Sequence, residues 1–94
     1  MHRFTGFFKP YLSEILEKYR KKLRLSQCKM AEKMGISTRY YHDLKHAISM
    51  LSLIEFIFML RLLPDEEKLN LIHEVESLIE SEEFKNYLDK IDFM

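Results

Sequence analysis

Polar side chains that could do chemistry crowd one short stretch, residues 37–46. Its sequence, STRYYHDLKH, holds an arginine, a lysine, an aspartate and two histidines four residues apart. Such a set suits three kinds of site: a metal pair on a helix, a catalytic cluster, or a surface that reads a nucleic acid. The pattern around these residues separates the three.

His42 and His46 have the i, i+4 spacing of two metal ligands on a helix. The run HDLKH lacks the glutamate of an HExxH motif, and no other cluster of Cys or His completes a ligand shell. The chain also offers no glycine-rich loop, and no Ser or Cys on a loop with a His partner. We therefore expect a protein that is not an enzyme and needs neither metal nor cofactor, and keep a metal-dependent switch at the two histidines as a weaker alternative.

The stretch 37–46 divides into two sides when it is wound as a helix at 100° per residue. One side is polar and carries Thr38, Arg39, His42, Asp43, Lys45 and His46. The other side carries Tyr40, Tyr41 and Leu44, and Ala47, directly after the stretch, continues it. We expect Tyr41 and Leu44 in the core, and Tyr40 either at the edge of the core or on a phosphate.

The polar side suits the chemistry of a DNA major groove. Arg39 can bind guanine O6 and N7 with two hydrogen bonds, Thr38 can contact a thymine methyl group, and His42 can bind a base acceptor. We expect the phosphates to be held by Lys29, Ser37, Tyr40, Lys45 and His46. Asp43 fits poorly against a polyanion; it either accepts from cytosine N4 or orients a neighbouring cation.

The elements that position these residues are predicted to be helices. Two glycines and two prolines in 94 residues are too few for a many-turned β protein, so we predict an all-α bundle of five to six helices. The first helix spans 10–23, with Pro10 in its first turn. Its apolar stripe consists of Leu12, Ile15, Leu16, Tyr19 and Leu23.

Serine residues mark the starts of the next helices. Ser26 caps a short second helix, Gly35 supplies its left-handed stop, and Ser37 caps the third helix, which runs to about residue 46. Inward-facing residues of the second helix are Met30, Ala31 and Met34. Ser52 and Glu55 fit a capping box that opens a fourth helix, over 52–63, whose apolar sequence predicts the most buried helix of the set.

The C-terminal stretch is also predicted to be helical. Pro64 ends the fourth helix and Asp65 caps a fifth. Apolar residues then recur at helical spacing at Leu69, Ile72, Val75, Leu78, Ile79, Phe84, Tyr87, Leu88 and Ile91. Whether this stretch is one helix or two stays open, because the polar run 80–83 could continue or break it.

Charge is divided unevenly along the chain. Residues 1–50 hold eleven Lys or Arg against four Asp or Glu, and residues 51–94 hold four against eleven, so the halves carry +7 and −7. This asymmetry favours a polyanion partner at one end, although two solvated helix faces of opposite sign give the same count. The single Cys28 excludes a disulfide framework and no apolar run spans a bilayer, so we expect a cytoplasmic protein with no membrane contact.

The segment 19–47, YRKKLRLSQCKMAEKMGISTRYYHDLKHA, resembles the helix-turn-helix of the Cro and lambda-repressor type, the XRE family. The matching residues are Arg20, Leu25, Ser26, Gln27, Ala31, Gly35, Ile36, Ser37 and, opening the fourth helix, Ser52. The resemblance covers about residues 12–63 and implies a five-helix, usually dimeric, DNA-binding domain that represses or activates transcription. It adds Gln27 to Thr38, Arg39 and His42 as a base-reading residue.

Three positions depart from the family pattern. Arg24 and Ala47 stand where the family commonly has glycine, and Lys45 stands where glutamate is common. Lys45 removes the glutamate that usually pairs with the arginine at position 20, and Arg24 suggests a modified helix end.

Two extensions flank the resemblance, an N-terminal one over 1–11 and a C-terminal helical one over 64–94. The apolar stripe of 64–94 is longer than is needed to cover the helices of 12–63, so we expect part of it to pack on a second copy of the chain and form a homodimer. Alternatively, it folds back onto the phenylalanines of the N-terminal extension, Phe4, Phe7 and Phe8.

The sequence thus predicts a sequence-specific DNA-binding transcriptional regulator, a repressor, that reads double-stranded DNA with residues 37–46 and takes no small-molecule ligand. The alternative is a module that uses the same fold to bind another protein, such as an antirepressor or a toxin partner.

Overall fold

The computed structural model describes residues 4–92, which form six α-helices and no strand. The helices are α1 (Thr5–Lys22), α2 (Gln27–Met34), α3 (Thr38–Lys45), α4 (Leu53–Arg61), α5 (Asp65–Glu80) and α6 (Glu82–Asp92). Residues 1–3 and 93–94 of the predicted extensions lie outside the described part, as does the side chain of Ile91. The prediction of an all-α protein with five to six helices is confirmed.

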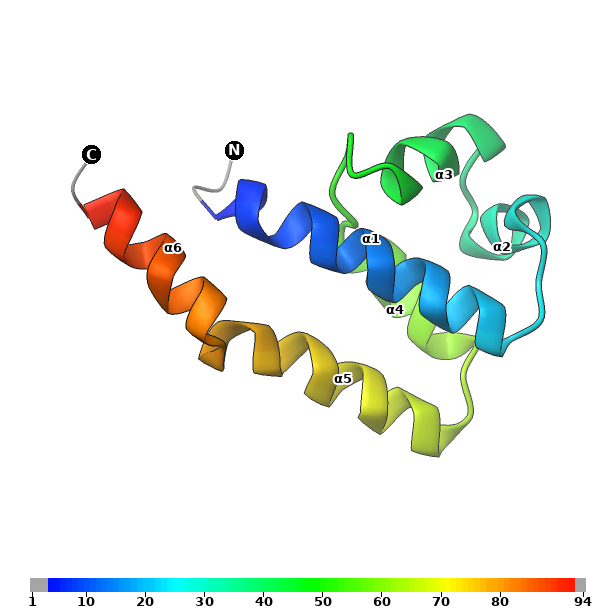
Figure 1. Ribbon diagram of the computed structural model, residues 1–94. Coiled ribbons are helices and arrows are strands. Elements are labelled where there is room, and N and C mark those ends of the chain that lie inside the picture. Colours follow the sequence, from blue (N-terminus) through cyan, green and yellow to red (C-terminus); the bar gives the residue numbers. More distant parts are fainter. Residues whose placement is uncertain (1–3, 93–94) are drawn as a thin grey trace.

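The helices are arranged around α1 (Figure 1). The short helices α2 and α3 lie toward one end of the molecule, α4 lies beside α1, and α5 runs along the opposite side before the chain turns into α6. The core that joins α1 to α5 consists of Ile15, Leu16, Tyr19, Met30, Ala31, Met34, Tyr41, Leu44, Leu51, Met59, Leu63 and Leu71. The predicted inward residues of the first two helices are confirmed, with Leu12 and Leu23 partly buried and packed against this core. None of the described helices has the length and apolar character to cross a membrane.

Three of the four predicted N-caps are present. The hydroxyls of Ser26, Ser37 and Ser52 each accept a hydrogen bond from the backbone N–H three residues ahead, and Ser52 completes a capping box with Glu55. The fifth helix differs, because its N-cap is Pro64 and Asp65 is its first residue. Asp65 still lies in the first turn, where a negative charge interacts favourably with the helix dipole.

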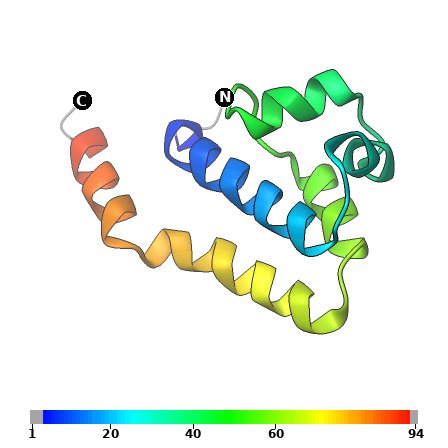
Figure 2. The same cartoon turned by 45° about the vertical axis from the view of Figure 1, so that its right-hand side comes forward.

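α1 begins at Thr5, five residues before the predicted start, and Pro10 lies inside the helix instead of in its first turn. A proline inside a helix removes one backbone hydrogen bond, which often ends the helix. Here aromatic packing supports the preceding turn, since the ring of Phe84 in α6 lies 5.0 Å from Phe7, 5.5 Å from Phe4 and 5.4 Å from Phe8. α6 thus folds back onto the start of α1 (Figure 2).

The C-terminal stretch is two helices that meet at Ser81. In α5, Leu71 is fully buried, with Val75 and Leu78 packed against the core. Three residues of the predicted apolar stripe are exposed, namely Leu69, Ile72 and Ile79. Because α5 carries apolar residues on two faces, periodicity alone did not select the face that packs.

α4 is not the most buried helix, contrary to the prediction. Met59 is its only buried residue, whereas Leu53 and Ile54 are 74% and 65% exposed. An apolar composition predicts burial only where neighbours exist on every side, and the described helices cover one side of α4.

Candidate nucleic-acid interface

The first three helices all end in a left-handed turn. The residue with positive φ at each end is Arg24 (59°), Gly35 (72°) or Ala47 (59°). After α3, the N–H of Ala47 donates to the carbonyl of Leu44 at 3.2 Å and that of Ile48 to Asp43 at 2.8 Å, the two hydrogen bonds of a Schellman motif. The equivalent bonds close α1 and α2. The expected modified end at Arg24 is therefore wrong, because Arg24 takes the conformation that glycine would adopt.

The inner side of α3 is fixed to the rest of the protein. Tyr41 and Leu44 are 0% and 2% exposed, which confirms them as core residues. The hydroxyl of Ser13 in α1 donates a hydrogen bond to the carbonyl of Lys45, in the last turn of α3. Both the middle and the end of α3 are thereby held against α1.

The outer side of α3 presents four of the predicted DNA contacts. The exposed side chains are Thr38, Arg39, His42 and His46. The guanidinium of Arg39 forms no ion pair or hydrogen bond with any described residue. The rings of His42 and His46 lie one helical turn apart, with centroids separated by 4.2 Å. An unpaired arginine, a hydroxyl and two imidazoles thus face solvent on one anchored helix.

A half-buried carboxylate, Glu17 of α1, lies beneath this surface. Its Oε2 accepts hydrogen bonds from the Tyr41 hydroxyl at 2.6 Å and from Arg20 Nε at 3.0 Å, and its Oε1 accepts from Arg20 Nη2 at 3.1 Å. Gln27 Nε2 and Lys45 Nζ lie 3.5 Å and 4.0 Å from Oε1. Glu17 therefore connects α1 to the start of α2 and to α3.

Sequence reasoning missed Glu17. Lys45 does remove one possible partner of Arg20, but Glu17 supplies the carboxylate from three residues earlier on the same helix. This i, i+3 spacing was a visible signal, since oppositely charged side chains one turn apart lie close on a helix. Arg20 also donates from Nη1 to the carbonyl of Leu25 at 2.7 Å, and so holds the loop between α1 and α2 in place.

The pKa values of this network reflect its contacts. Burial would raise the pKa of Glu17, but the hydrogen bonds from Arg20 and Tyr41 and the charges of Arg20 and Lys45 outweigh it and lower that pKa. Burial, helped by the hydrogen bond to Glu17, raises the pKa of Tyr41. The hydrogen bond to Glu17 raises the pKa of Arg20. Glu17 is thus held ionised, while Tyr41 stays protonated and donates to it.

The remaining predicted phosphate contacts have partners within the chain. The hydroxyl of Tyr40 donates to Glu55 Oε1 at 3.3 Å, which places Tyr40 at the edge of the core. Lys29 Nζ lies 3.4 Å from Glu32 Oε2, although both side chains are exposed. The hydroxyl of Ser37 accepts the N–H of Tyr40 as the N-cap of α3. These residues border the open side of α3.

Part of the charge asymmetry is neutralised between α1 and α5. Lys18 pairs with Glu74 at 2.9 Å, and Lys22 pairs with Glu67 at 3.0 Å. The hydroxyl of Tyr19 also donates to Glu74 at 3.1 Å, and burial together with this bond raises the pKa of Tyr19 to about 12. The basic first half and the acidic second half of the chain therefore attract each other directly.

Metal ligation at His42 and His46 is the weaker alternative for this region. Within residues 4–92, no group of three His, Cys, Asp or Glu side chains is placed to hold a metal ion. The thiol of Cys28 lies 3.6 Å from the hydroxyl of Thr38, where it forms a contact between α2 and α3.

Comparison of the chain with models of known protein families, with characterised proteins and with solved structures finds no match. The class of the molecule is therefore given by its own geometry. It is an all-helical protein that presents one short, capped and anchored helix, with cationic and hydrogen-bonding side chains on the open side of that helix.

Proposed function

We propose that the protein is a sequence-specific DNA-binding regulator of transcription, a repressor, that places α3 in the major groove of double-stranded DNA. The observation that carries this proposal is the division of α3, in which Tyr41 and Leu44 are buried while unpaired Arg39 faces solvent. The major groove, about 12 Å wide, admits an α-helix. The resemblance of residues 12–63 to the XRE family supports the same function.

In this proposal Arg39 reads guanine, Thr38 contacts a thymine methyl group and His42 binds a base acceptor. Gln27 is partly buried and its amide donates to Glu17 at 3.5 Å, so it would first have to leave that carboxylate to reach a base. We assign phosphate contacts to His46, Ser37 and Lys29. Lys29, Lys45 and Tyr40 would first have to exchange their carboxylate partners for phosphates, so we give them a smaller share of the binding free energy.

In this proposal the protein acts in the cytoplasm by binding DNA and catalyses no reaction. It acts as a homodimer, because two copies of α3 can then read half-sites separated by about 34 Å.

Salt dependence of binding tests for phosphate contacts. Fluorescence anisotropy with a duplex of random sequence would be measured at several salt concentrations. The logarithm of the affinity falls against the logarithm of salt concentration with a slope of about −0.9 for each phosphate contacted. Absence of binding at low salt, or an affinity that does not change with salt, contradicts the proposal.

Base reading is tested on an operator selected from random duplexes. Arg39→Ala weakens binding by about 5- to 150-fold, since a bidentate contact with guanine is worth about 1–3 kcal/mol. Arg39→Lys keeps the charge but not the two-pronged donor, so the salt slope persists and the base preference weakens. Lys85→Ala removes an exposed charge from α6 and serves as the matched control. Equal affinity of Arg39→Ala and the unmodified protein would show that α3 is not the reader.

A module that binds another protein is the second candidate function, since α4 exposes Leu53 and Ile54. Such a module would show no salt-dependent binding to random duplex, so the anisotropy experiment separates the two functions.

A further inference from the structure

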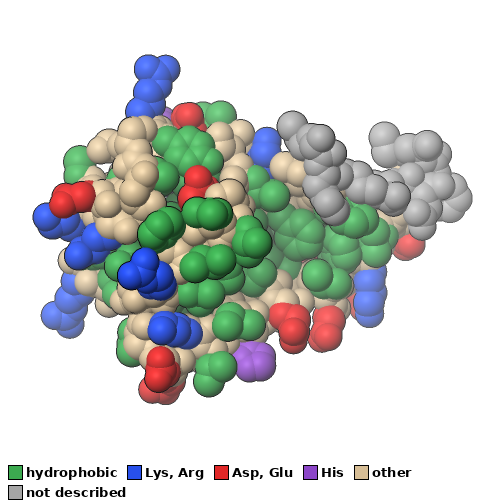
Figure 3. Space-filling view, turned by 180° about the vertical axis from the view of Figure 1, so that it is seen from behind, with side chains coloured by type: hydrophobic (Ala, Val, Ile, Leu, Met, Phe, Trp, Pro, Cys, Tyr) green, Lys and Arg blue, Asp and Glu red, His purple; other side chains and the backbone are tan. Residues whose placement is uncertain are grey.

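An apolar surface lies on the outer side of α4 and on the loop before it. It consists of Ile48 (60% exposed), Leu53 (74%), Ile54 (65%) and Ile57 (47%), which we call the α4 face. Figure 3 shows hydrophobic side chains gathered over the side of the molecule opposite to that of Figure 1. Monomeric soluble proteins rarely expose large contiguous apolar patches, and such patches commonly mark an interaction site.

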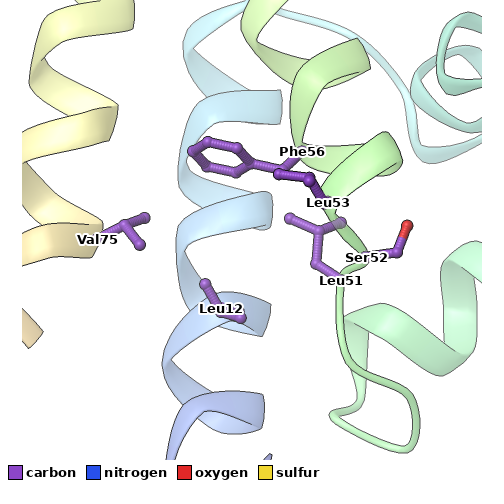
Figure 4. Close-up of a pocket in the computed structure, with 6 residues that line it drawn as sticks. All are labelled: Leu12, Leu51, Ser52, Leu53, Phe56 and Val75. Atoms are coloured by element: carbon purple, nitrogen blue, oxygen red, sulfur yellow. The ribbon is translucent and has the colours of Figure 1, made fainter. Parts of the chain in front are cut away.

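A hollow adjoins the α4 face. It has a volume of about 290 Å³ and lies between α1, α4 and α5 (Figure 4). Its lining is apolar except for one serine: Leu12, Leu51, Ser52, Leu53, Phe56 and Val75. Leu53 belongs to both features, so protruding side chains and a hollow that accepts side chains lie next to each other.

We infer that the α4 face and the adjoining hollow are covered by a second copy of this chain. A two-fold interface brings the same patch of two molecules together, so it must be self-complementary in shape and charge. The α4 face meets the shape requirement, because the protruding Leu53 and Ile54 of one copy can enter the hollow of the other.

Charge favours the same occupant. Among the residues of α4, only Glu55 and Arg61 are charged. Glu55 accepts hydrogen bonds from the Ser52 N–H at 2.9 Å and from the Tyr40 hydroxyl at 3.3 Å, and the Arg61 guanidinium lies 5.8 Å from the centre of the Phe58 ring. At the other end of the surface, Lys9 Nζ donates to the carbonyl of Ile48 at 3.3 Å. Two copies of the surface can therefore meet over α4 with little repulsion between like charges, provided that the two Lys9 side chains stay apart.

The exposed stripe of α5 is a poorer site for a second copy. Its apolar residues are Leu69, Ile72 and Ile79. Exposed carboxylates alternate with them on the same helix, at Glu66, Glu76 and Glu80. Pairing this stripe with itself would bring like charges together, which is unfavourable. α6 is already packed on the start of α1. We therefore place the homodimer contact on the α4 face and not on residues 64–94.

The α4 face also continues from the proposed reading surface. Ile48 lies two residues after His46, the C-cap of α3, so contact at this point would hold two copies of α3 in a fixed relation. The dimer itself does not rest on DNA binding and can be measured without DNA.

Sedimentation velocity of the full chain, over a range of protein concentrations and without DNA, tests the inference. The unmodified protein sediments as a dimer at micromolar concentrations. Ile54→Glu raises the dimer dissociation constant at least about tenfold, because two carboxylates would enter an apolar interface. The substitution leaves the fold intact, since Ile54 is exposed in the first turn of α4, where a negative charge favours the helix.

Leu69→Glu is the matched control, because Leu69 is exposed to a similar extent, 59%, and lies on α5. It leaves the dimer dissociation constant unchanged. Circular dichroism confirms that both variants retain their helices. A monomer at every concentration, or a dimer broken by Leu69→Glu and not by Ile54→Glu, overturns the inference, whereas a dimer that binds no duplex would refute only the proposed DNA function.

Discussion

The left-handed end of α3 allows a sharp test of the backbone geometry. Ala47 has φ of 59°, a conformation that glycine adopts freely and that other L-residues adopt at a cost. Ala47→Gly should therefore stabilise the protein. The left-handed conformation costs alanine about 1–2 kcal/mol. Against this, glycine loses about 0.5–1 kcal/mol more through the greater freedom of the unfolded chain.

The net gain expected from Ala47→Gly is about 0.5–1 kcal/mol, the difference between these two effects. For a chain of this size the gain corresponds to an increase in Tm of roughly 2–8 °C. Urea unfolding followed by circular dichroism gives the free energy, and a thermal scan gives Tm.

Gly35→Ala is the reciprocal control, because it puts alanine where glycine has positive φ. Gly35 has φ of 72°, and a Cβ added to it would meet no heavy atom within 4 Å outside its two chain neighbours, so the substitution changes the backbone conformational preference without a steric clash. It should destabilise the protein by about 0.5–1 kcal/mol for the same reasons. If Ala47→Gly destabilised the protein, or if Gly35→Ala left it unchanged, positive φ at these helix ends would not carry the assigned cost.

Two further predictions concern side chains. Glu17→Gln should cost about 1.5–3 kcal/mol at neutral pH in urea unfolding, because Arg20 loses a charged hydrogen-bond partner. Folding lowers the pKa of Glu17, so the contribution of its carboxylate to the free energy of unfolding is complete above the ordinary pKa of 4.5 and is lost as the pH falls through the lower folded pKa. The free energies of unfolding of the Glu17→Gln variant and the unmodified protein should therefore converge in acid. A difference in acid as large as that at neutral pH would contradict this prediction. Phe84→Ala should reduce the local stability of α6 by up to about 3–5 kcal/mol. Faster amide hydrogen exchange in α6, with α2 and α3 unchanged, would show this, and unchanged exchange in α6 would count against the aromatic contact.

Local signals predicted the central helices well. The hydroxyls of Ser26, Ser37 and Ser52 act on N–H groups only three residues away, so their caps can be recognised without knowledge of the fold. The core positions of α2 and α3 were likewise predictable, because both helices are short and have one apolar side.

Features that depend on distant contacts were not predictable from local pattern. The early start of α1 depends on Phe84, more than seventy residues away in sequence. The exposure of α4 depends on the absence of a neighbour on its outer side, which composition does not reveal. In the candidate site, the open side of α3 followed from helical geometry, whereas Glu17 matters because α1 brings it under Tyr41.

The position of the Glu17 carboxylate limits the order in which this chain can change during evolution. Here the carboxylate of Glu17 stands on α1 and the ammonium group of Lys45 stands on α3, 4.0 Å away. Lys45→Glu alone would bring a second carboxylate close to Glu17, and loss of Glu17 alone would leave Arg20 without its partner. Positions 17 and 45 are therefore mutationally coupled. A move of the carboxylate from α1 to α3 would have to change both residues together.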